Sequence, residues 1–91
     1  MKTMYKYPLE IKTHQKVRLP RSAKVTCVKV VGGKLCAYAF VDTDETEFVY
    51  DHIYIYGTGH EIRKEHLGFI DTCLMPNGEV WHVFVDIDPE L

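Results

Sequence analysis

Residues 25–41, VTCVKVVGGKLCAYAFV, decide the fold of this 91-residue chain. Two runs rich in β-branched and apolar residues, 25–31 and 34–41, flank the pair Gly32-Gly33. A two-residue glycine linker favours a tight hairpin, because glycine adopts the positive φ angles that such turns require. The second run is largely apolar at both its odd and its even positions, which point to opposite faces of a strand. Both faces are therefore expected to be covered by other parts of the protein.

Further strands lie on both sides of this hairpin and are separated by proline, glycine and asparagine turn signals. Residues 67–75 and 79–85 are joined around Asn77-Gly78, the strongest short-range hairpin signal. The longest strand is expected between the two hairpins. In full, the expected strands cover residues 4–9, 15–19, 25–31, 34–41, 47–56, 67–75 and 79–85.

The expected fold class is therefore mainly β: a small single-domain antiparallel sandwich or barrel-like sheet with two tight hairpins, spanning residues 1–91. A chain of this length buries only about two thirds of its unfolded surface, which is close to the lower limit for stability. A homo-oligomer is therefore expected. The acidic tail, residues 86–91, is expected to fray.

Charge and composition limit the classes of partner. The formal net charge of −2 gives no overall basic field, so non-specific nucleic-acid binding is not expected. The chain has no apolar run long enough for a signal peptide or a membrane span, which predicts a cytoplasmic protein without a membrane partner. Cys27, Cys36 and Cys73 form no Cys-x-x-Cys pair, and this predicts reduced thiols in the core. No cofactor is expected.

The longest strand ends in the Gly-x-Gly turn of residues 57–60, which is the candidate ligand site. Glycines allow backbone N–H groups to approach an anion, and the side chains of Thr58 and His60 add hydrogen-bond donors. A dinucleotide fingerprint would need a glycine where Ile62 stands, so a simple strand-ending turn is the alternative. The candidate ligand-binding residues are Tyr54, Tyr56, Gly57, Thr58, Gly59, His60 and Arg63.

Alternation in the longest strand places five ring-bearing side chains on one face. Such a face can stack a nucleobase, or it can belong to the core or to a subunit interface. The polar segment 59–66 is expected to form an excursion of at most one helical turn that acts as a lid. Arg63 and Lys64 in this segment are the natural partners for a phosphate. The five side chains are Phe48, Tyr50, His52, Tyr54 and Tyr56.

The sequence assigns no catalytic and no metal-binding residue. The five histidines lack the spacing of known metal-ligand motifs. They also lack the His-x-Thr/Ser repeats of two-histidine phosphoesterases. Ser22 is the only serine, and no Gly-x-Ser-x-Gly elbow surrounds it, so hydrolase-type nucleophilic catalysis has no support.

Residues 1–9, 17–20 and 55–60 together resemble a family of small uncharacterised phage and prophage proteins. Members begin with a Lys-Thr-hydrophobic-Tyr/Phe-Lys-Tyr-Pro segment, carry a Gly-Thr-Gly-His block, and end near a His-Val-Phe segment, here residues 82–84. Glu61 departs from this pattern, which has proline after the histidine. The resemblance covers most of the chain and implies a phage accessory protein in the cytoplasm of a bacterial host, with no assigned activity.

Three functions are compatible with these observations. The first is a non-enzymatic anti-defence binding protein that sequesters a nucleotide-like small molecule. The second is an inhibitor that binds a host or phage protein through a sheet edge or the tyrosine face. The third, with less support, is a phosphodiesterase that pairs His60 with His52, His66 or His82 as acid and base.

Overall fold

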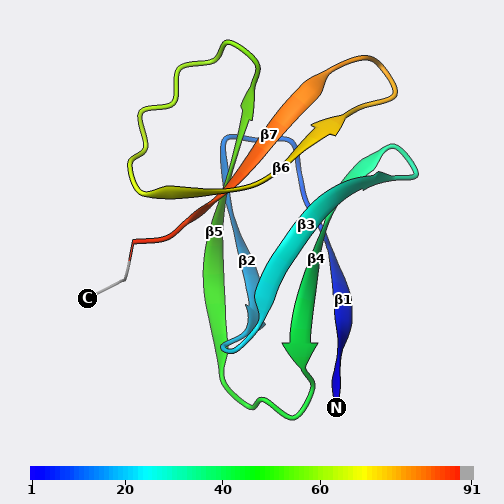
Figure 1. Ribbon diagram of the computed structural model, residues 1–91, viewed down its shortest axis with the longest axis vertical. Helices are drawn as coiled ribbons and strands as arrows, with labels where there is room; N and C mark the ends of the chain where they lie inside the picture. Colours follow the sequence, from blue (N-terminus) through cyan, green and yellow to red (C-terminus); the bar gives the residue numbers. More distant parts are fainter. Residues whose placement is uncertain (89–91) are drawn as a thin grey trace.

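The computed structural model describes residues 1–88 and contains seven strands but no helix among them (Figure 1). The predicted mainly β fold is confirmed. Among the described residues, no helix is therefore long and apolar enough to cross a membrane. Most of the tail predicted to fray, residues 89–91, lies outside the described residues. The strands are β1 (Lys2–Pro8), β2 (His14–Pro20), β3 (Lys24–Val31), β4 (Lys34–Asp42), β5 (Phe48–Gly57), β6 (Leu67–Leu74) and β7 (Val80–Asp86).

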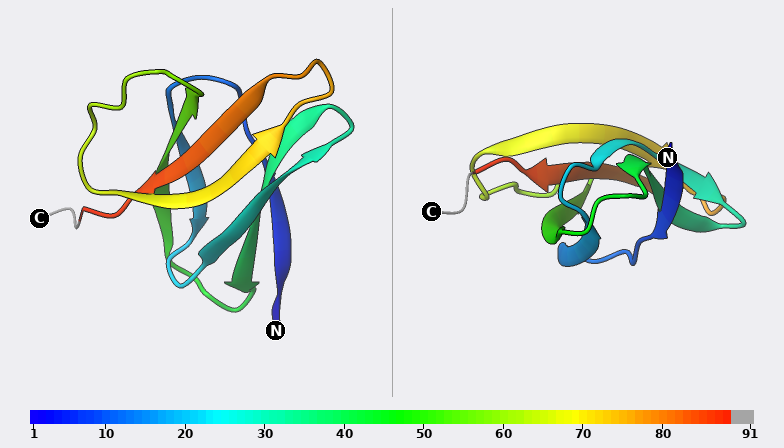
Figure 2. Two further views of the ribbon diagram at one scale, coloured as in Figure 1. Left: turned by 45° about the horizontal axis from the view of Figure 1, so that its top comes forward. Right: turned by 90° about the horizontal axis from the view of Figure 1, so that it is seen from below.

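The strands form two antiparallel sheets, one of three strands in the order β1-β4-β3 and one of four in the order β2-β5-β7-β6. Figure 2 shows that the two sheets lie against each other, with β3 of one sheet running beside β6 of the other. The chain crosses between the sheets after β1, β2 and β4. Residues distant in sequence therefore meet on each face.

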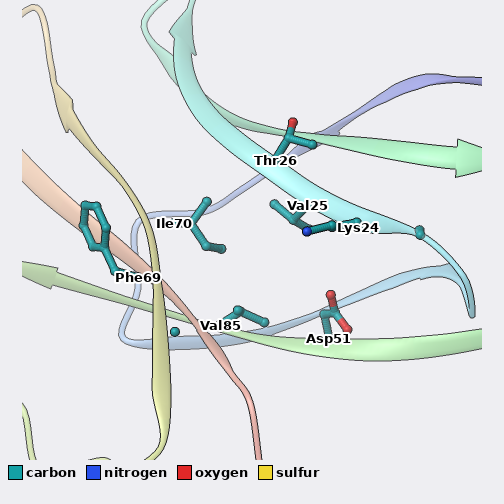
Figure 3. A pocket seen from close by; sticks show the side chains of 9 residues that line it. Lys24, Val25, Thr26, Asp51, Phe69, Ile70 and Val85 are labelled. Carbon is teal, nitrogen blue, oxygen red and sulfur yellow. The ribbon is translucent and has the colours of Figure 1, made fainter.

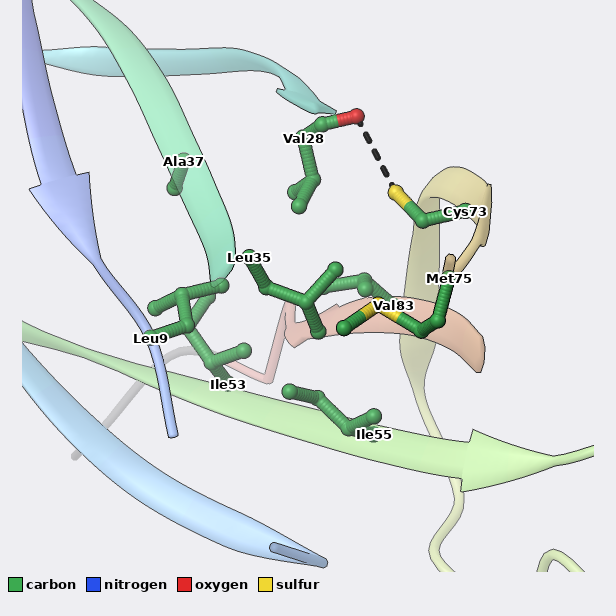
Figure 4. Packing of buried hydrophobic residues seen from close by; sticks show 9 residues of the cluster. All are labelled: Leu9, Val28, Leu35, Ala37, Ile53, Ile55, Cys73, Met75 and Val83. Atoms are coloured by element: carbon green, nitrogen blue, oxygen red, sulfur yellow. Dashed lines mark hydrogen bonds between the residues drawn. The ribbon is translucent and has the colours of Figure 1, made fainter. Parts of the chain in front are cut away.

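The core lies between the two sheets (Figure 4). Val28 of β3 and Val83 of β7 are fully buried there, and Ile53 of β5 is 1% exposed. Burying a side chain of this kind stabilises a fold by about 1.5–3 kcal/mol, so these contacts hold the sheets together. The full cluster comprises Leu9, Val28, Leu35, Ala37, Ile53, Ile55, Cys73, Met75 and Val83.

Both predicted hairpins are present. Gly32 and Gly33 have φ angles of 57° and 79°, as expected of a two-residue type I′ turn, and Val31 pairs with Lys34. The second loop is longer. Its closing bonds run from the Met75 N–H to the Glu79 carbonyl (2.7 Å) and from the Gly78 N–H to the Met75 carbonyl (2.9 Å). Residues 76–78 form this loop. Proline at 76 has a fixed negative φ angle and Gly78 alone in the loop is left-handed, so the loop lacks the two consecutive positive φ angles of a type I′ turn.

Burial of β4 follows the predicted two-sided pattern only in part. Leu35, Ala37, Ala39 and Val41 face the core and are at most 2% exposed. On the outer face of the strand, formed by the alternate residues, Cys36 is buried, whereas Phe40 is 46% exposed. The outer face of this strand is thus open at one end. The other two cysteines are also free thiols, Cys73 buried and Cys27 half-buried.

Candidate functional site

The Gly57–His60 turn follows β5 directly. The His60 N–H donates to the Gly57 carbonyl (3.1 Å), and Gly59 supplies the left-handed position with a φ angle of 85°. The imidazole of His60 folds back and its Nδ1 accepts a hydrogen bond from the Gly57 N–H (3.1 Å). A Cβ atom at residue 57 would lie 2.8 Å from Cε1 of this ring. Glycine at 57 is therefore needed for the close approach of the histidine.

His60 and Trp81 of β7 form an open groove at the end of the sheet. Their rings meet edge to face with centroids 6.3 Å apart. Because Nδ1 of His60 accepts a hydrogen bond, Nε2 carries the proton of the neutral ring and is a donor. The indole N–H of Trp81 is buried without a hydrogen-bond partner among the described residues. The groove, of about 450 Å³, is lined by Gly57, Thr58, His60, Gly78, Glu79, Val80 and Trp81.

Thr58 is engaged on the other side of the turn. Its hydroxyl lies 2.8 Å from Nε2 of His82, whose Nδ1 lies 2.9 Å from the hydroxyl of Thr72. A neutral imidazole offers one donor and one acceptor, which these two hydroxyls use completely. His82 of β7 thus links the turn after β5 to β6. It is not placed as an acid or base partner for His60.

Segment 59–66 is irregular and contains no helical turn. Arg63 lies in its exposed part and forms an ion pair with Glu61 (3.0 Å). The next residue, Lys64, turns back to the sheet. Its ammonium group lies 3.3 Å from the carboxylate of Asp86 and 5.9 Å from the ring centroid of Tyr54. Of the two predicted phosphate partners, Lys64 is the one that lies over the sheet.

The four-stranded sheet carries a continuous row of rings on the face turned away from the core. The register aligns His14 with Tyr54, Tyr54 with Phe84, and Phe84 with Phe69, so the row crosses all four strands. The predicted alternation in β5 is confirmed, because Ile53 and Ile55 lie in the core. The outer aromatic face comprises His14, Lys16, Arg18, Phe48, Tyr50, His52, Tyr54, Tyr56, Phe69, His82, Phe84 and Asp86.

His14 and His52 form a flat plate on this face. Nε2 of His14 lies 2.8 Å from Nδ1 of His52, and the ring planes differ by 8°. The centroids are 5.1 Å apart, about the nitrogen separation plus two ring radii, so the rings meet edge to edge in one plane. Tyr54 lies against this plate, with its centroid 4.7 Å from that of His14 and a plane angle of 20°. The plate therefore presents two separate rings side by side in one plane.

Cationic side chains from β2 cover neighbouring rings. The guanidinium of Arg18 lies 4.1 Å from the ring centroid of Phe48, and the ammonium of Lys16 lies 5.2 Å from that of Tyr50. Each contact stabilises the pair by only about 0.5–1 kcal/mol at an exposed site. These cations can therefore move to a bound anion at small cost.

The predicted site residues do not converge on a single pocket. Tyr54 lies on the outer aromatic face, and Tyr56 lies on the same face but is only 8% exposed, with its ring edge against Phe84. Thr58 binds His82. Gly57, Gly59 and His60 form the turn beside Trp81, and Arg63 stays in the loop.

Sequence reasoning missed the contribution of β2 to the site. Residues 14, 16 and 18 are polar or basic at alternate positions, which is the pattern of a strand with one charged face. That signal was present. Only the pairing of β2 with β5 places these side chains beside Tyr50 and Tyr54.

A separate cavity of about 330 Å³ opens between the sheets where β3 and β6 diverge (Figure 3). Both strands carry a register shift there, at residues 25–27 and 69–71. Asp51 of β5 points into this space with Val85 of β7. Burial raises the pKa of the Asp51 carboxyl group, and its electrostatic interaction with the neighbouring His52 lowers that pKa by less. Within residues 1–88, no group of three or more metal-ligating side chains converges here or elsewhere.

Comparison with known proteins gives one match. A family model described as a domain of unknown function (DUF7352) matches residues 1–90. No curated protein and no solved structure matches the chain.

Proposed function

The chain belongs to the DUF7352 family, a domain family of unknown function, and on this premise we propose that it is a non-enzymatic binding protein that sequesters a nucleotide-like small molecule. The proposed site is the outer aromatic face of the four-stranded sheet, at the His14-His52 plate and Tyr54. The single observation that supports it is the coplanar, hydrogen-bonded pair of imidazoles, of which His14 stacks on Tyr54.

A base stacks on such a plate because flat rings with polar edges prefer offset parallel contact, and base stacking contributes about 1–3 kcal/mol. The histidine rings are already held in one plane by their hydrogen bond, so little side-chain entropy is lost when a base binds. Tyr50 extends the surface, since this residue is 56% exposed.

Phosphate groups of the ligand are bound by the surrounding cations. Lys16 and Arg18 lie on one side of the plate and Lys64 on the other. Lys64 belongs to segment 59–66, so closure of this segment over a ligand is the lid motion expected from the sequence. The Gly57–His60 turn fixes the start of this segment on the sheet. It therefore contributes to the site indirectly, by positioning the segment that carries Lys64.

Sequestration fits this site better than turnover. The two imidazoles of the plate bind each other, and both nitrogens of His82 are engaged by threonine hydroxyls. A histidine acid-base pair needs two rings on opposite sides of the reacting group. Together with the analogy to the phage proteins that the chain resembles, this supports an accessory protein that removes a nucleotide-like defence signal in the host cytoplasm.

The test is thermal unfolding of the purified protein with mononucleotides, cyclic oligonucleotides and ADP-ribose derivatives. A ligand at about 1,000 times its Kd adds about 4 kcal/mol of stability, which shifts the midpoint of a small domain by many degrees. The shift is expected to vanish in His14→Ala and Tyr54→Leu. Recovery of the ligand unchanged after denaturation supports sequestration, whereas recovery of a cleaved product contradicts it.

Tyr5→Ala is the matched control, because Tyr5 is a 45% exposed tyrosine of the three-stranded sheet. This variant should keep the full ligand-induced shift. An equal loss of the shift in Tyr5→Ala and Tyr54→Leu would place the ligand elsewhere. The absence of any shift across the panel would reject the nucleotide-like ligand.

A second candidate, binding to another protein or to a second copy of the chain, has its own support in β1. Met4 and Tyr5 point to opposite faces of this edge strand, and both are more than 40% exposed. An edge strand exposed on both faces pairs readily with another chain. Light scattering across a concentration series tests it: a dimer that Tyr5→Lys dissociates supports the interface, and a monomer at all concentrations rejects self-association.

A further inference from the structure

Charge is strongly segregated along this chain. Residues 1–41 contain nine basic residues and one acidic residue, whereas residues 42–91 contain two basic residues and twelve acidic residues. The net charge of −2 hides this separation. Strands β1, β3 and β4 all come from residues 2–42, and they carry five of these nine basic residues: Lys2, Lys6, Lys24, Lys29 and Lys34.

The strand register places several lysines of the three-stranded sheet on its outer face. Because Ala37, Ala39 and Val41 of β4 point to the core, the side chains of Tyr38 and Phe40 point away from it. Phe40 lies between Met4 of β1 and Lys24 of β3 in the register. The next row places Tyr38 between Lys6 and Cys27. Each row therefore has an aromatic ring at its centre and a lysine on one flank.

Three lysines on this face have no neutralising partner. Lys6, Lys24 and Lys34 are exposed, and among the described residues none of them forms an ion pair. Asp42 is the only acidic residue on the three strands, and it lies at the corner opposite Lys2. Lys29 is paired with Asp71 (3.3 Å). We call the surface formed by Lys6, Lys24, Lys34, Tyr38 and Phe40 the basic face.

We propose that the basic face binds single-stranded nucleic acid, with bases stacked on Phe40 and Tyr38 and phosphates held by Lys6, Lys24 and Lys34. Successive rows of a sheet are about 6.8 Å apart, which an extended single strand can match with one nucleotide per row. Aromatic side chains on an exposed sheet face flanked by cations are the recurrent means of binding such strands.

A merely solvated face would look different. Solvated faces carry both signs of charge interspersed, and here the central region carries only one. Lysines also protect edge strands from aggregation, which accounts for Lys6 on β1 and Lys24 on β3. Protection of an edge does not account for Phe40, which lies on the central strand and is 46% exposed. This inference is independent of the nucleotide site, which lies on the other sheet.

The test is fluorescence anisotropy with labelled oligothymidylate and oligouridylate of about a dozen nucleotides, a length within the usual range for small β domains. Three phosphate contacts predict a slope of about −2 for log K against log salt, so affinity should fall about twentyfold when the salt concentration is raised fourfold. The triple variant Lys6→Gln, Lys24→Gln, Lys34→Gln should flatten this slope. Phe40→Thr should weaken binding at least about fivefold without changing the slope.

The matched control is the double variant Lys12→Gln, Arg21→Gln, which removes two exposed cations that pair with Glu10 and Glu47 and belong to neither proposed site. It should bind the oligonucleotide like the unmodified protein. Equal loss in the control and in the triple variant, equal affinity for a duplex of the same length, or no measurable binding at low salt would each overturn the proposal. Thermal unfolding of every variant verifies the fold, and because the substituted lysines are exposed, their midpoints should not change.

Discussion

The carboxylate of Asp71 on β6 accepts a hydrogen bond from the backbone N–H of Val28 on β3, at 3.1 Å, and so joins the edges of the two sheets. The thiol of Cys73 donates to the Val28 carbonyl at 3.2 Å. These two side chains satisfy the backbone groups that Val28 turns away from its own sheet. Because Val28 is fully buried, its backbone groups depend on these protein partners in the folded state.

Asp71→Ala should therefore lower the free energy of unfolding by about 2–3 kcal/mol. The substitution leaves the Val28 N–H buried and unsatisfied, and hydrogen bonds to charged groups contribute about 1.5–3 kcal/mol. Asp71→Asn is the control, because its amide oxygen can still accept the bond, and it should lose about half as much. Urea unfolding gives both values. An Asp71→Ala variant as stable as the unmodified protein would show that the sheets are held by the core alone.

The same carboxylate predicts a dependence of stability on pH. Burial raises the pKa of the Asp71 carboxyl group. Hydrogen bonds from the Val28 and Thr72 N–H groups and the ammonium of Lys29 lower it by more, so the net pKa lies below the ordinary value. When the pKa of a carboxyl group is lower in the folded state than in the unfolded state, the group stabilises the fold at pH values above its unfolded pKa. This contribution is lost as the pH falls through the folded pKa. Urea unfolding across acidic pH should show this loss, and Asp71→Asn should lack that part of it.

Gly57 and His60 should be coupled. Gly57→Ala places a methyl group 2.8 Å from Cε1 of His60, so the ring must move and its bond to the residue 57 N–H breaks. We expect a loss of about 1–2 kcal/mol, the usual range for overpacking and a lost hydrogen bond. In a His60→Ala background the same substitution should be almost neutral. Additive effects in this double-mutant cycle would show that the His60 ring is not the reason why residue 57 must be glycine.

Local signals predicted the parts of the fold that depend on neighbouring residues. The Gly32-Gly33 hairpin and the alternation of β5 follow from residues close in the chain, and both are present. The row through His14 and Tyr54 could not be predicted, because it depends on strand pairing across about forty residues. The position of Lys64 depends on a loop without periodicity. The charge segregation was readable in the sequence, but the net charge conceals it.

Asp51→Asn should stabilise the protein near neutral pH. The carboxylate of Asp51 is half-buried beside Val25 and Val85, and within residues 1–88 it forms no ion pair or hydrogen bond. Burial raises its folded pKa above the unfolded value, so stability declines as pH rises from the unfolded pKa through the folded one. Asparagine has the same shape and no charge to desolvate. We expect a gain of about 0.5–1 kcal/mol, within the usual range of single stabilising substitutions.

The pH profile distinguishes this cause from others. Below the ordinary carboxyl pKa of about 3.9 both folded and unfolded Asp51 are protonated, so the advantage of Asp51→Asn should disappear there. Val25→Ala, which changes the wall of the same cavity without changing charge, should give a stability difference that does not vary with pH. A gain in Asp51→Asn that is equal at all pH values would assign the effect to packing. A loss near neutral pH would mean that the carboxylate has a stabilising partner in solution.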